Sequence, residues 1–214
     1  MIEFFAFFQS RLLEIGILTV EHIELTGIAI CLAIVTGVPA GILLTRYKES
    51  SSVVLGIVSV IQTIPSLALL GFMIPLFGIG AKPAIIVLFL YALLPIIRNT
   101  FTGIEGVEPA LIEAGRGMGM TNLELLNMVE LPLALPVIMA GIRTSTVINV
   151  GITTLCALIG AGGLGQLIFR GISMVNAHMI LAGAIPAALL ALILDFLLGQ
   201  MEKLLSPKGL KLSI

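Results

Sequence analysis

The chain has 214 residues, enough for one domain, but only 11% of them are charged, against about 25% in a soluble domain. Hydrophobic residues make up 58% of the chain, and the mean hydropathy is +1.19. The formal net charge of −1 gives no basic field that would attract nucleic acid, so we expect no nucleic-acid partner. The composition predicts an all-α integral membrane protein that is embedded in the lipid bilayer.

Cysteine and histidine are too sparse and too scattered for a disulfide framework or a metal site. Cys31 and Cys156 lie in separate apolar runs, and His22 and His178 are equally isolated. We therefore expect this chain to bind no metal and no cofactor. Neither histidine belongs to a recognisable catalytic arrangement, so we expect no catalytic residues.

Residues 1–24 differ in character from the apolar runs that follow. The N-terminus lacks the basic region of a cleaved secretory signal. Phe4, Phe5, Phe7 and Phe8 are followed by acidic residues, a pattern typical of an amphipathic segment at the outer membrane interface. The alternative is that this segment extends the first membrane helix.

Five apolar runs without charged residues follow, and each is a candidate for a membrane helix, which needs about 20 residues. They are Leu25–Thr45, Val53–Ala81, Pro83–Ile97, Thr144–Phe169 and Gly171–Leu194. The third run is short, and it can lengthen through Asn99–Phe101 if the Arg98 side chain reaches to the interface. Five helices within residues 25–200 place the two termini on opposite sides of the membrane.

Basic residues between the runs predict the orientation, because cytoplasmic loops carry more Lys and Arg. One set of loops is richer in them than the other, and Arg143 is left out because its depth is ambiguous. The richer set holds Arg46, Lys48, Arg98, Arg116, Lys203, Lys208 and Lys211, and the poorer set holds Arg11, Lys82 and Arg170. We therefore expect the N-terminus outside and a cytoplasmic tail at residues 201–214.

A polar patch interrupts the second run. Gln62, Thr63, Pro65 and Ser66 lie together there, and polar groups at membrane depth usually face a bundle interior or a cavity. We expect these residues to line a translocation pathway. The alternative is a packing kink at the proline.

A second polar group lies in the fourth run. Asn149 and Thr153 are four residues apart and share one helix face. Either they line the pathway or they form hydrogen bonds between helices. We expect Arg143, just before this run, to have a structural partner, because an arginine near a membrane span is costly unless it is paired or solvated.

The longest segment between runs, residues 99–130, predicts two short helices on the cytoplasmic side. Pro109 suits the first turn of one helix, and three glycines then weaken and end it. Residues 121–124, Thr-Asn-Leu-Glu, are a capping-box pattern that starts the second helix, which is expected to end or kink near Leu131-Pro132. The few apolar residues here cannot form a core alone, so the segment needs a partner; the alternative is an ordinary ordered loop. The three glycines are Gly115, Gly117 and Gly119.

The same segment resembles the EAA loop of the permease subunits of ATP-binding-cassette (ABC) importers. That pattern is Glu-Ala-Ala, three residues, Gly, nine residues, Ile, one residue and Leu-Pro. The chain keeps every spacing and departs only by Gly115 for the second Ala and Val129 for Ile. The matching residues are Glu113, Ala114, Gly115, Gly119, Val129, Leu131 and Pro132.

Four further segments are similar to the osmoprotectant branch of these importers, whose permeases carry glycine betaine, carnitine, choline or related compounds. They are residues 61–67, 94–100, 140–146 and 159–165, and the likeness extends over residues 25–209. The resemblance implies a five-helix type I importer permease core, similar to that of methionine importers, in the cytoplasmic or inner membrane.

The resemblance also implies a division of labour. Separate ATPase subunits hold ATP and Mg²⁺ and dock on the EAA loop, where Glu113, Ala114 and Gly119 mark the coupling helix and Gly115, Leu131 and Pro132 complete the motif. A second copy of this chain or a sister permease completes a dimer, and an extracytoplasmic binding protein captures the solute. This chain has no Gly-x-x-x-x-Gly-Lys-Ser/Thr motif, so we expect it not to be an enzyme.

Two alternatives to the osmoprotectant importer stay open. One is an importer permease for another small solute that is similar to an amino acid. The other is a carrier without an ATPase, which would be expected to hold ionisable residues at mid-membrane; the span centres lack them, Arg143 excepted. The chain has no Trp and two Tyr, so we expect no high-affinity aromatic cage for a quaternary ammonium group within it.

Residues 160–165 fit the Gly-x-Gly-x-x-Gly pattern of dinucleotide-binding proteins. That pattern has meaning only between a strand and a helix, whereas here it lies at the end of an apolar run. We expect a tight outer turn or a close helix contact instead.

Overall fold

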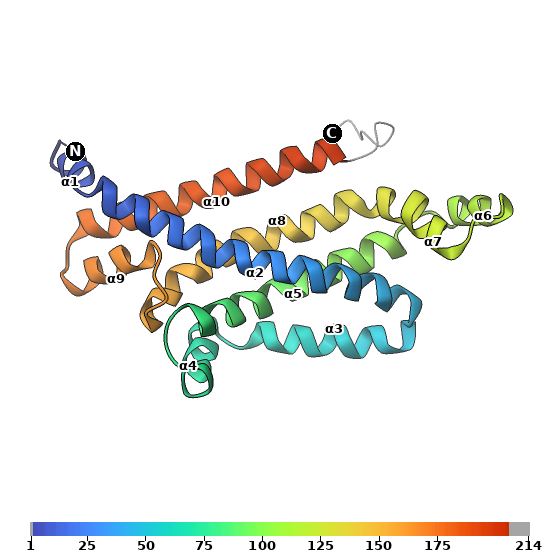
Figure 1. The fold of residues 1–214 in the computed structure, drawn as a ribbon, viewed down its shortest axis with the longest axis horizontal. Coiled ribbons are helices and arrows are strands. Elements are labelled where there is room, and N and C mark those ends of the chain that lie inside the picture. The colour runs from blue at the N-terminus through green and yellow to red at the C-terminus, as the bar shows by residue number, and fades with distance from the viewer. Residues whose placement is uncertain (1, 206–214) are drawn as a thin grey trace.

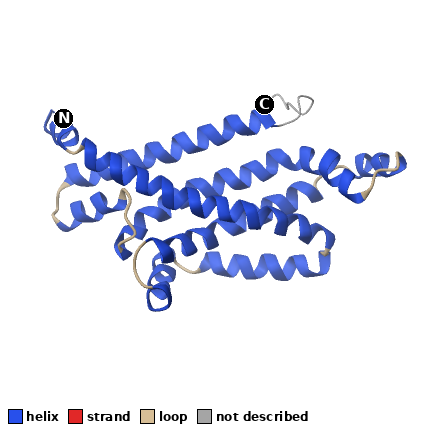
Figure 2. Cartoon of the chain, viewed as in Figure 1, coloured by secondary structure: helices blue, strands red, loops and turns tan. Residues whose placement is uncertain are grey.

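The computed structural model describes residues 2–205, and every regular element in that range is a helix (Figure 2). Four of these helices are long and apolar enough to cross a membrane, and a bent pair supplies a fifth crossing if it counts as one span. The helices are α1 (Ile2–Ser10), α2 (Leu12–Arg46), α3 (Lys48–Thr63), α4 (Ser66–Phe77), α5 (Ala81–Glu105), α6 (Pro109–Gly117), α7 (Asn122–Leu125), a π-helical turn (Leu126–Glu130), α8 (Leu131–Cys156), a 3₁₀ turn (Ala157–Ile159), α9 (Gly165–Ser173) and α10 (Ala177–Leu205). The predicted all-α membrane fold is confirmed.

The long helices lie along one another and share the long axis of the molecule (Figure 1). Helices α6 and α7 project from one end of the bundle, which we call the α6–α7 end, and α1 and α9 lie at the other, the α9 end. Because α2 and α10 both run from the α9 end towards the α6–α7 end, the first and last described residues lie at opposite ends. Helix α5 packs against α2, α3, α4 and α8 and so forms the centre of the bundle.

Close approach of α5 to its neighbours depends on glycine. Gly37 and Gly41 are four residues apart on α2, the small-xxx-small spacing of tightly packed membrane helices. A Cβ atom at Gly41 would lie 2.6 Å from the Cβ atom of Thr100 on α5. On the other side of α5, a Cβ atom at Gly141 of α8 would lie 2.7 Å from the Pro95 carbonyl oxygen. Helix α5 is therefore held between two backbones that have no room for side chains.

The first long helix begins earlier than the apolar run indicated. Helix α2 has 35 residues and is about 50 Å long, which exceeds the hydrocarbon thickness of about 30 Å. The expected boundary after residue 24 falls inside α2, so residues 12–24 extend the first helix, which is the alternative given above. Only α1 is a separate N-terminal segment, and its place at the outer interface stays a prediction.

Two acidic residues in the first half of α2 have partners at the α9 end. The Glu14 carboxylate accepts a hydrogen bond from Arg170 Nη1 at 2.8 Å, and Glu21 Oε2 accepts one from the backbone N–H of Gly163 at 2.9 Å. Both partners come from residues far along the chain, so the pairing was not visible in the sequence.

The fourth and fifth passes also differ from the expected runs. The helices expected from the runs 144–169 and 171–194 have other boundaries in the structure, since α8 is Leu131–Cys156 and α10 is Ala177–Leu205. Arg143 does not end α8, because acidic residues of α10 neutralise it. After α8, glycines with positive φ break the helix. They are Gly160 (+74°), Gly162 (+98°) and Gly163 (+80°).

The expected tail boundary at residue 201 falls inside α10. Residues 206–214, and with them Lys208 and Lys211 of the charge count, lie outside the described residues. The third pass agrees with the prediction, because α5 continues through the exposed Arg98 to Glu105.

Candidate functional site: the EAA segment and the bend at Pro65

The turn after α6 requires glycine at position 119. Helix α6 begins at Pro109, as predicted. After it ends, the Met120 N–H donates to the Gly115 carbonyl at 3.1 Å and the Gly119 N–H donates to the Arg116 carbonyl at 3.0 Å. These two bonds form a Schellman motif, in which Gly119 has φ +81°. A residue with a side chain rarely adopts that conformation, so Gly119 determines the shape of the segment.

Gly115 is the point at which α6 packs on the following helix. It is buried, and a Cβ atom there would lie 2.7 Å from Leu125 Cδ1 and 3.2 Å from Met120 Sδ. Leu125 is itself buried, at 1% exposure. The glycine that replaces the second alanine of the motif therefore accompanies a tight contact between α6 and α7.

Helix α7 starts as predicted. The Thr121 hydroxyl accepts a hydrogen bond from the Glu124 N–H at 3.3 Å, and Glu124 Oε2 accepts one from the Thr121 N–H at 2.7 Å. These reciprocal bonds are the predicted capping box. They hold the start of α7 directly after the α6 turn.

The second helix was expected to end or kink near Leu131-Pro132, and the structure shows that it does not end there. The helix widens into the π-helical turn and continues as α8. The Leu131 N–H bonds to the Leu126 carbonyl, five residues earlier, which is the π-helical pattern. Pro132, the second residue of α8, follows this turn and has no N–H to continue the helical hydrogen-bond pattern. The segment is therefore continuous with a membrane pass.

The outer surface of α6 and α7 is exposed in this subunit. Glu113 and Ala114 are exposed, and Glu113 has no hydrogen-bond or ion-pair partner among residues 2–205. Large apolar side chains around them are exposed as well, which is typical of a surface that contacts another protein. They are Leu111, Met118, Leu123 and Met128.

One residue of the π-helical turn is a buried acid. Glu130 is 2% exposed and accepts a hydrogen bond from Arg46 at the end of α2. The pair is buried on the Glu130 side only, because the Arg46 side chain is 41% exposed. The sequence analysis counted Arg46 only as a loop charge and did not single out Glu130. The available signal was an acid placed between the apolar residues Val129 and Leu131.

The polar patch of the second pass lies at a sharp bend. Helices α3 and α4 meet at 94°, and Ile64 and Pro65 between them have extended ψ angles of 128° and 131°. Proline lacks an N–H and disfavours a helical conformation of the residue before it, so the helix ends here.

Two hydrogen bonds tie this bend to Tyr91 of α5. Pro95 has no N–H, so the Tyr91 carbonyl, four residues earlier, lacks its usual helical donor. Gln62 Nε2 donates to that oxygen at 3.2 Å, and the Tyr91 hydroxyl donates to the Ile64 carbonyl at the bend. The sequence analysis missed Tyr91, although its spacing of four residues from Pro95 marked a carbonyl in need of a donor.

The other bend residues lie towards the subunit surface. Thr63 and Pro65 are exposed and Ser66 is half-buried. The Thr63 hydroxyl donates to the Val60 carbonyl of its own helix at 2.7 Å. Gln62 therefore holds the bend in place, while Thr63, Pro65 and Ser66 are available to a solute or a neighbouring subunit.

Asn149 and Thr153 lie inside the helix packing and are both 0% exposed. Asn149 Nδ2 donates to the Leu88 carbonyl of α5 at 2.9 Å, and Thr153 Oγ1 lies 3.0 Å from Thr26 Oγ1 of α2. These are interhelical hydrogen bonds, the alternative given for this pair. The structure does not place them on the exposed surface where Thr63 and Pro65 lie.

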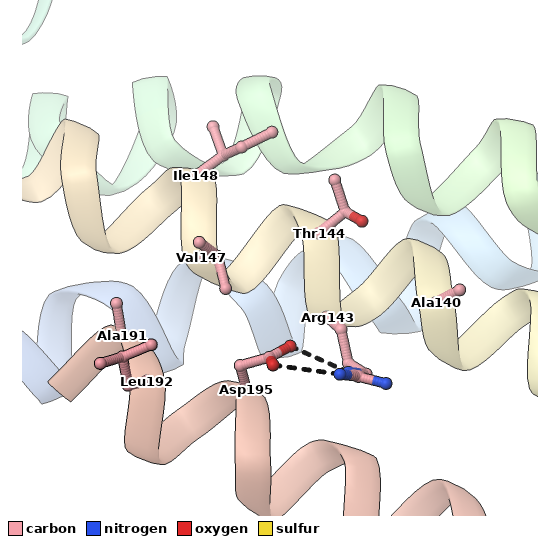
Figure 3. A pocket seen from close by; sticks show the side chains of 8 residues that line it. All are labelled: Ala140, Arg143, Thr144, Val147, Ile148, Ala191, Leu192 and Asp195. Atoms are coloured by element: carbon pink, nitrogen blue, oxygen red, sulfur yellow. Dashed lines mark hydrogen bonds and ion pairs between the residues drawn. The ribbon is translucent and has the colours of Figure 1, made fainter. Parts of the chain in front are cut away.

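Arg143 has the predicted structural partners. Its Nε and Nη2 atoms donate to the two carboxylate oxygens of Asp195 at 2.9 and 3.0 Å, and Nη1 donates to Glu202 at 3.1 Å. Figure 3 shows the Arg143–Asp195 pair at a groove of about 470 Å³ between α8 and α10. The remaining lining is Ala140, Thr144, Val147, Ile148, Ala191 and Leu192.

The glycines of residues 160–165 form a tight turn at the α9 end, as predicted. Gly163 binds Glu21 through its N–H, and a Cβ atom on it would lie 3.2 Å from His22 Nδ1. The segment thus packs against α2. Within residues 2–205, no three His, Cys, Asp or Glu side chains are grouped so that they could hold a metal ion.

Comparison with known proteins agrees with this architecture. Residues 33–209 match the family described as binding-protein-dependent transport system inner membrane component. The chain is 47% identical over 211 residues to the glycine betaine/carnitine/choline transport system permease protein OpuCB of Bacillus subtilis (strain 168), over 99% of this chain and 97% of the relative. It is 49% identical over 205 residues to the choline transport system permease protein OpuBB of the same organism, over 96% and 94% of the two chains.

A solved structure shares the fold. A chain of the MetNI methionine ABC transporter in an inward facing conformation matches with a TM-score of 0.79 and 26% identity, over 87% of this chain and 94% of that chain. The predicted type I importer permease fold is thereby confirmed. Helical architecture, the EAA segment and these relatives agree: the chain belongs to the family of binding-protein-dependent transport system inner membrane components, the permease subunits of ABC importers.

Proposed function

We propose that this chain forms the translocation pathway of an importer for osmoprotectants such as glycine betaine, carnitine or choline. Its 47% identity, over 99% of the chain, to a permease named for these compounds carries the proposal. The bend at Pro65 suits such solutes, because Gln62 fixes its shape and the neighbouring Thr63 and Ser66 are polar but uncharged. Uncharged groups solvate a permanently charged ammonium without binding it too tightly for release.

In this proposal the exposed face of α6 is the docking site of a separate ATPase, which holds ATP and Mg²⁺ and performs the hydrolysis. Glu113 and Ala114 contact the ATPase, Gly115 keeps α6 close to α7, and Gly119 shapes the turn. Leu131 and Pro132 then connect the docked segment to α8. The continuous helical path from α7 into α8 supports this assignment.

The α6–α7 end is then the cytoplasmic end and the N-terminus lies outside. Among the described residues, Arg46 ends α2 and Lys48 begins α3 at the α6–α7 end, and Arg116 lies in α6; Arg98 and Lys203 lie in the later halves of α5 and α10, which run towards this end. The opposite end holds Arg11 just before α2, Lys82 in the first turn of α5 and Arg170 in α9. The α6–α7 end therefore has more basic residues, which supports its cytoplasmic orientation because cytoplasmic loops carry more Lys and Arg.

The remaining partners follow from the proposed orientation. An extracytoplasmic binding protein delivers the solute at the α9 end, and α1 lies at the outer membrane interface. A second copy of this chain or a sister permease closes the pathway against the exposed bend residues. Asn149 and Thr153 hold α8 against α5 and α2, and so shape the pathway wall from inside the subunit.

Purification with this chain as bait tests the proposal. The recovered complex, reconstituted with its binding protein, is assayed for ATP hydrolysis with glycine betaine, carnitine, choline and methionine in turn. We expect an ATPase to co-purify and one or more of the first three solutes to stimulate it. Stimulation by methionine alone would support the assignment as an importer but would show that its substrate is an amino acid rather than an osmoprotectant. Absence of a co-purifying ATPase would contradict the coupling role of α6.

A further inference from the structure

The ion pair between Arg46 and Glu130 joins the EAA segment to a helix with which it is not continuous in sequence. Glu130 is the last residue of the π-helical turn and is 2% exposed, whereas the Arg46 side chain is 41% exposed. A carboxylate removed from water requires a charged or hydrogen-bonding partner. Arg46 is the partner that the structure gives it.

A continuous series of contacts leads from α6 to this pair. A Cβ atom at Gly115 of α6 would lie 2.7 Å from Leu125 Cδ1 and 3.9 Å from Val129 Cγ2. Val129 precedes Glu130 directly. A displacement of α6 therefore acts on the π-helical turn through packed side chains, and the turn acts on Arg46 through the ion pair.

Arg46 is well placed to pass on such a displacement. It ends α2, and after Tyr47 the chain enters α3. Helix α3 runs from this corner to the bend at Pro65, where Gln62 is bound to Tyr91. Figure 1 shows the α2–α3 corner at the same end of the bundle as α6 and α7.

We propose that Arg46 and Glu130 are positioning residues that transmit motion of the EAA segment to the α2–α3 corner, and through α3 to the bend. Helix α8 receives the same motion directly, because it is continuous with the π-helical turn. The ion pair makes the two helical routes move together. The inference rests on the proposed function, since it assumes that an ATPase displaces α6.

If the Arg46–Glu130 ion pair transmits motion, weakening it has a measurable effect that weakening a purely structural ion pair lacks. A loosened link leaves docking and hydrolysis in place but lowers the amount of solute moved for each ATP hydrolysed. A purely structural pair, once weakened, lowers the yield of folded complex, and hydrolysis and uptake fall in the same proportion. The ratio of uptake to hydrolysis separates the two roles.

The test uses the full complex in proteoliposomes. Arg46→Lys keeps the charge opposite Glu130 but gives up the planar, multiply bonding guanidinium, so the subunit folds with a looser link. Glu130→Gln removes the charge with little change of shape. The double variant R46E/E130R reverses the pair. Glu202→Gln is the matched control, because it removes one carboxylate from Arg143 while Asp195 remains.

We expect Arg46→Lys and Glu130→Gln to retain ATP hydrolysis and to lower the uptake-to-hydrolysis ratio at least threefold. The reversed pair should recover at least half of the wild-type ratio, and Glu202→Gln should keep all of it. A wild-type ratio in Arg46→Lys would overturn the inference, whether or not Glu130→Gln folds. If the wild-type complex itself showed no ATP-dependent uptake, the proposed function would fail, a result distinct from failure of the link.

Discussion

Gln62 donates a hydrogen bond to the backbone carbonyl of Tyr91 at 3.2 Å, an oxygen that Pro95 leaves without its helical donor. Pro95 of α5 thereby leaves a free acceptor to which the bend between α3 and α4 is bound. Because the Tyr91 hydroxyl also donates to Ile64, the bend is held on α5 by two bonds that depend on a single residue.

Loss of this anchor should weaken transport more than assembly. Gln62→Leu removes one hydrogen bond, worth about 1 kcal/mol, which corresponds to roughly a fivefold change in an equilibrium or rate. We expect uptake to fall by about that factor while ATPase association stays unchanged. Ser59→Ala is the control, because the Ser59 hydroxyl donates to the Leu55 carbonyl of the same helix and Ser59 lies outside the proposed pathway. Equal loss of uptake in both variants would argue against an anchoring role for Gln62.

Gly119→Ala should distort the turn between α6 and α7. The αL conformation costs a residue with a Cβ atom about 1–2 kcal/mol, and Gly119 has φ +81°. We expect reduced co-purification of the ATPase, measured by the ratio of the two subunits after affinity capture. Gly117→Ala is the matched control, since a Cβ atom at Gly117 would meet no atom within 4 Å. A normal subunit ratio in Gly119→Ala would show that the turn does not control docking.

Glu113→Ala tests the docking surface itself. The side chain is exposed and unpaired among residues 2–205, so the subunit should keep its thermal stability to within about 0.5 kcal/mol. Loss of an interface contact should weaken ATPase binding by about 1–2 kcal/mol, measured by titration of the purified ATPase onto the reconstituted permease. Glu108→Ala, at an exposed glutamate just before α6, is the control. Wild-type affinity in Glu113→Ala would remove this residue from the interface.

The α2–α5 contact should tolerate no side chain at position 41. Gly41→Ala places a Cβ atom 2.6 Å from the Cβ atom of Thr100, and overpacking of this kind costs about 1–3 kcal/mol. We expect a lower unfolding temperature of the purified subunit. Gly27→Ala, on the same helix but with open space around it, should leave that temperature unchanged. A similar shift in both variants would point to helix flexibility rather than packing.

Local rules were enough to predict the EAA segment from the sequence. Pro109 begins α6, the Thr121–Glu124 capping box begins α7, and Gly119 adopts the conformation that ends the α6 turn. Each of these features depends on residues within a few positions of one another, so the sequence contains all the information they need. Four of the five expected passes were equally predictable, because they depend on the length of apolar runs; the second run forms a bent helix pair that supplies the fifth crossing if it counts as one span.

Helix boundaries were less predictable, because they depend on partners far along the chain. Charges were taken as breaks between spans, yet Arg143 lies inside α8 because Asp195, 52 residues later, neutralises it. Glu14 likewise lies inside α2, paired with Arg170. The same limit explains why Asn149 was left between two roles: its hydrogen bond to the Leu88 carbonyl joins two helices and leaves no trace in local spacing.

The central claim is that this chain moves a quaternary ammonium solute when a partner ATPase hydrolyses ATP. Uptake of radiolabelled glycine betaine, carnitine and choline by proteoliposomes that contain the purified complex tests it most directly. We predict that at least one of these solutes is taken up, and that its uptake requires both ATP on the cytoplasmic side of the membrane and the binding protein on the opposite side. Flux that continues without ATP, from a preparation with no ATPase, would contradict the account and identify the chain as an independent carrier.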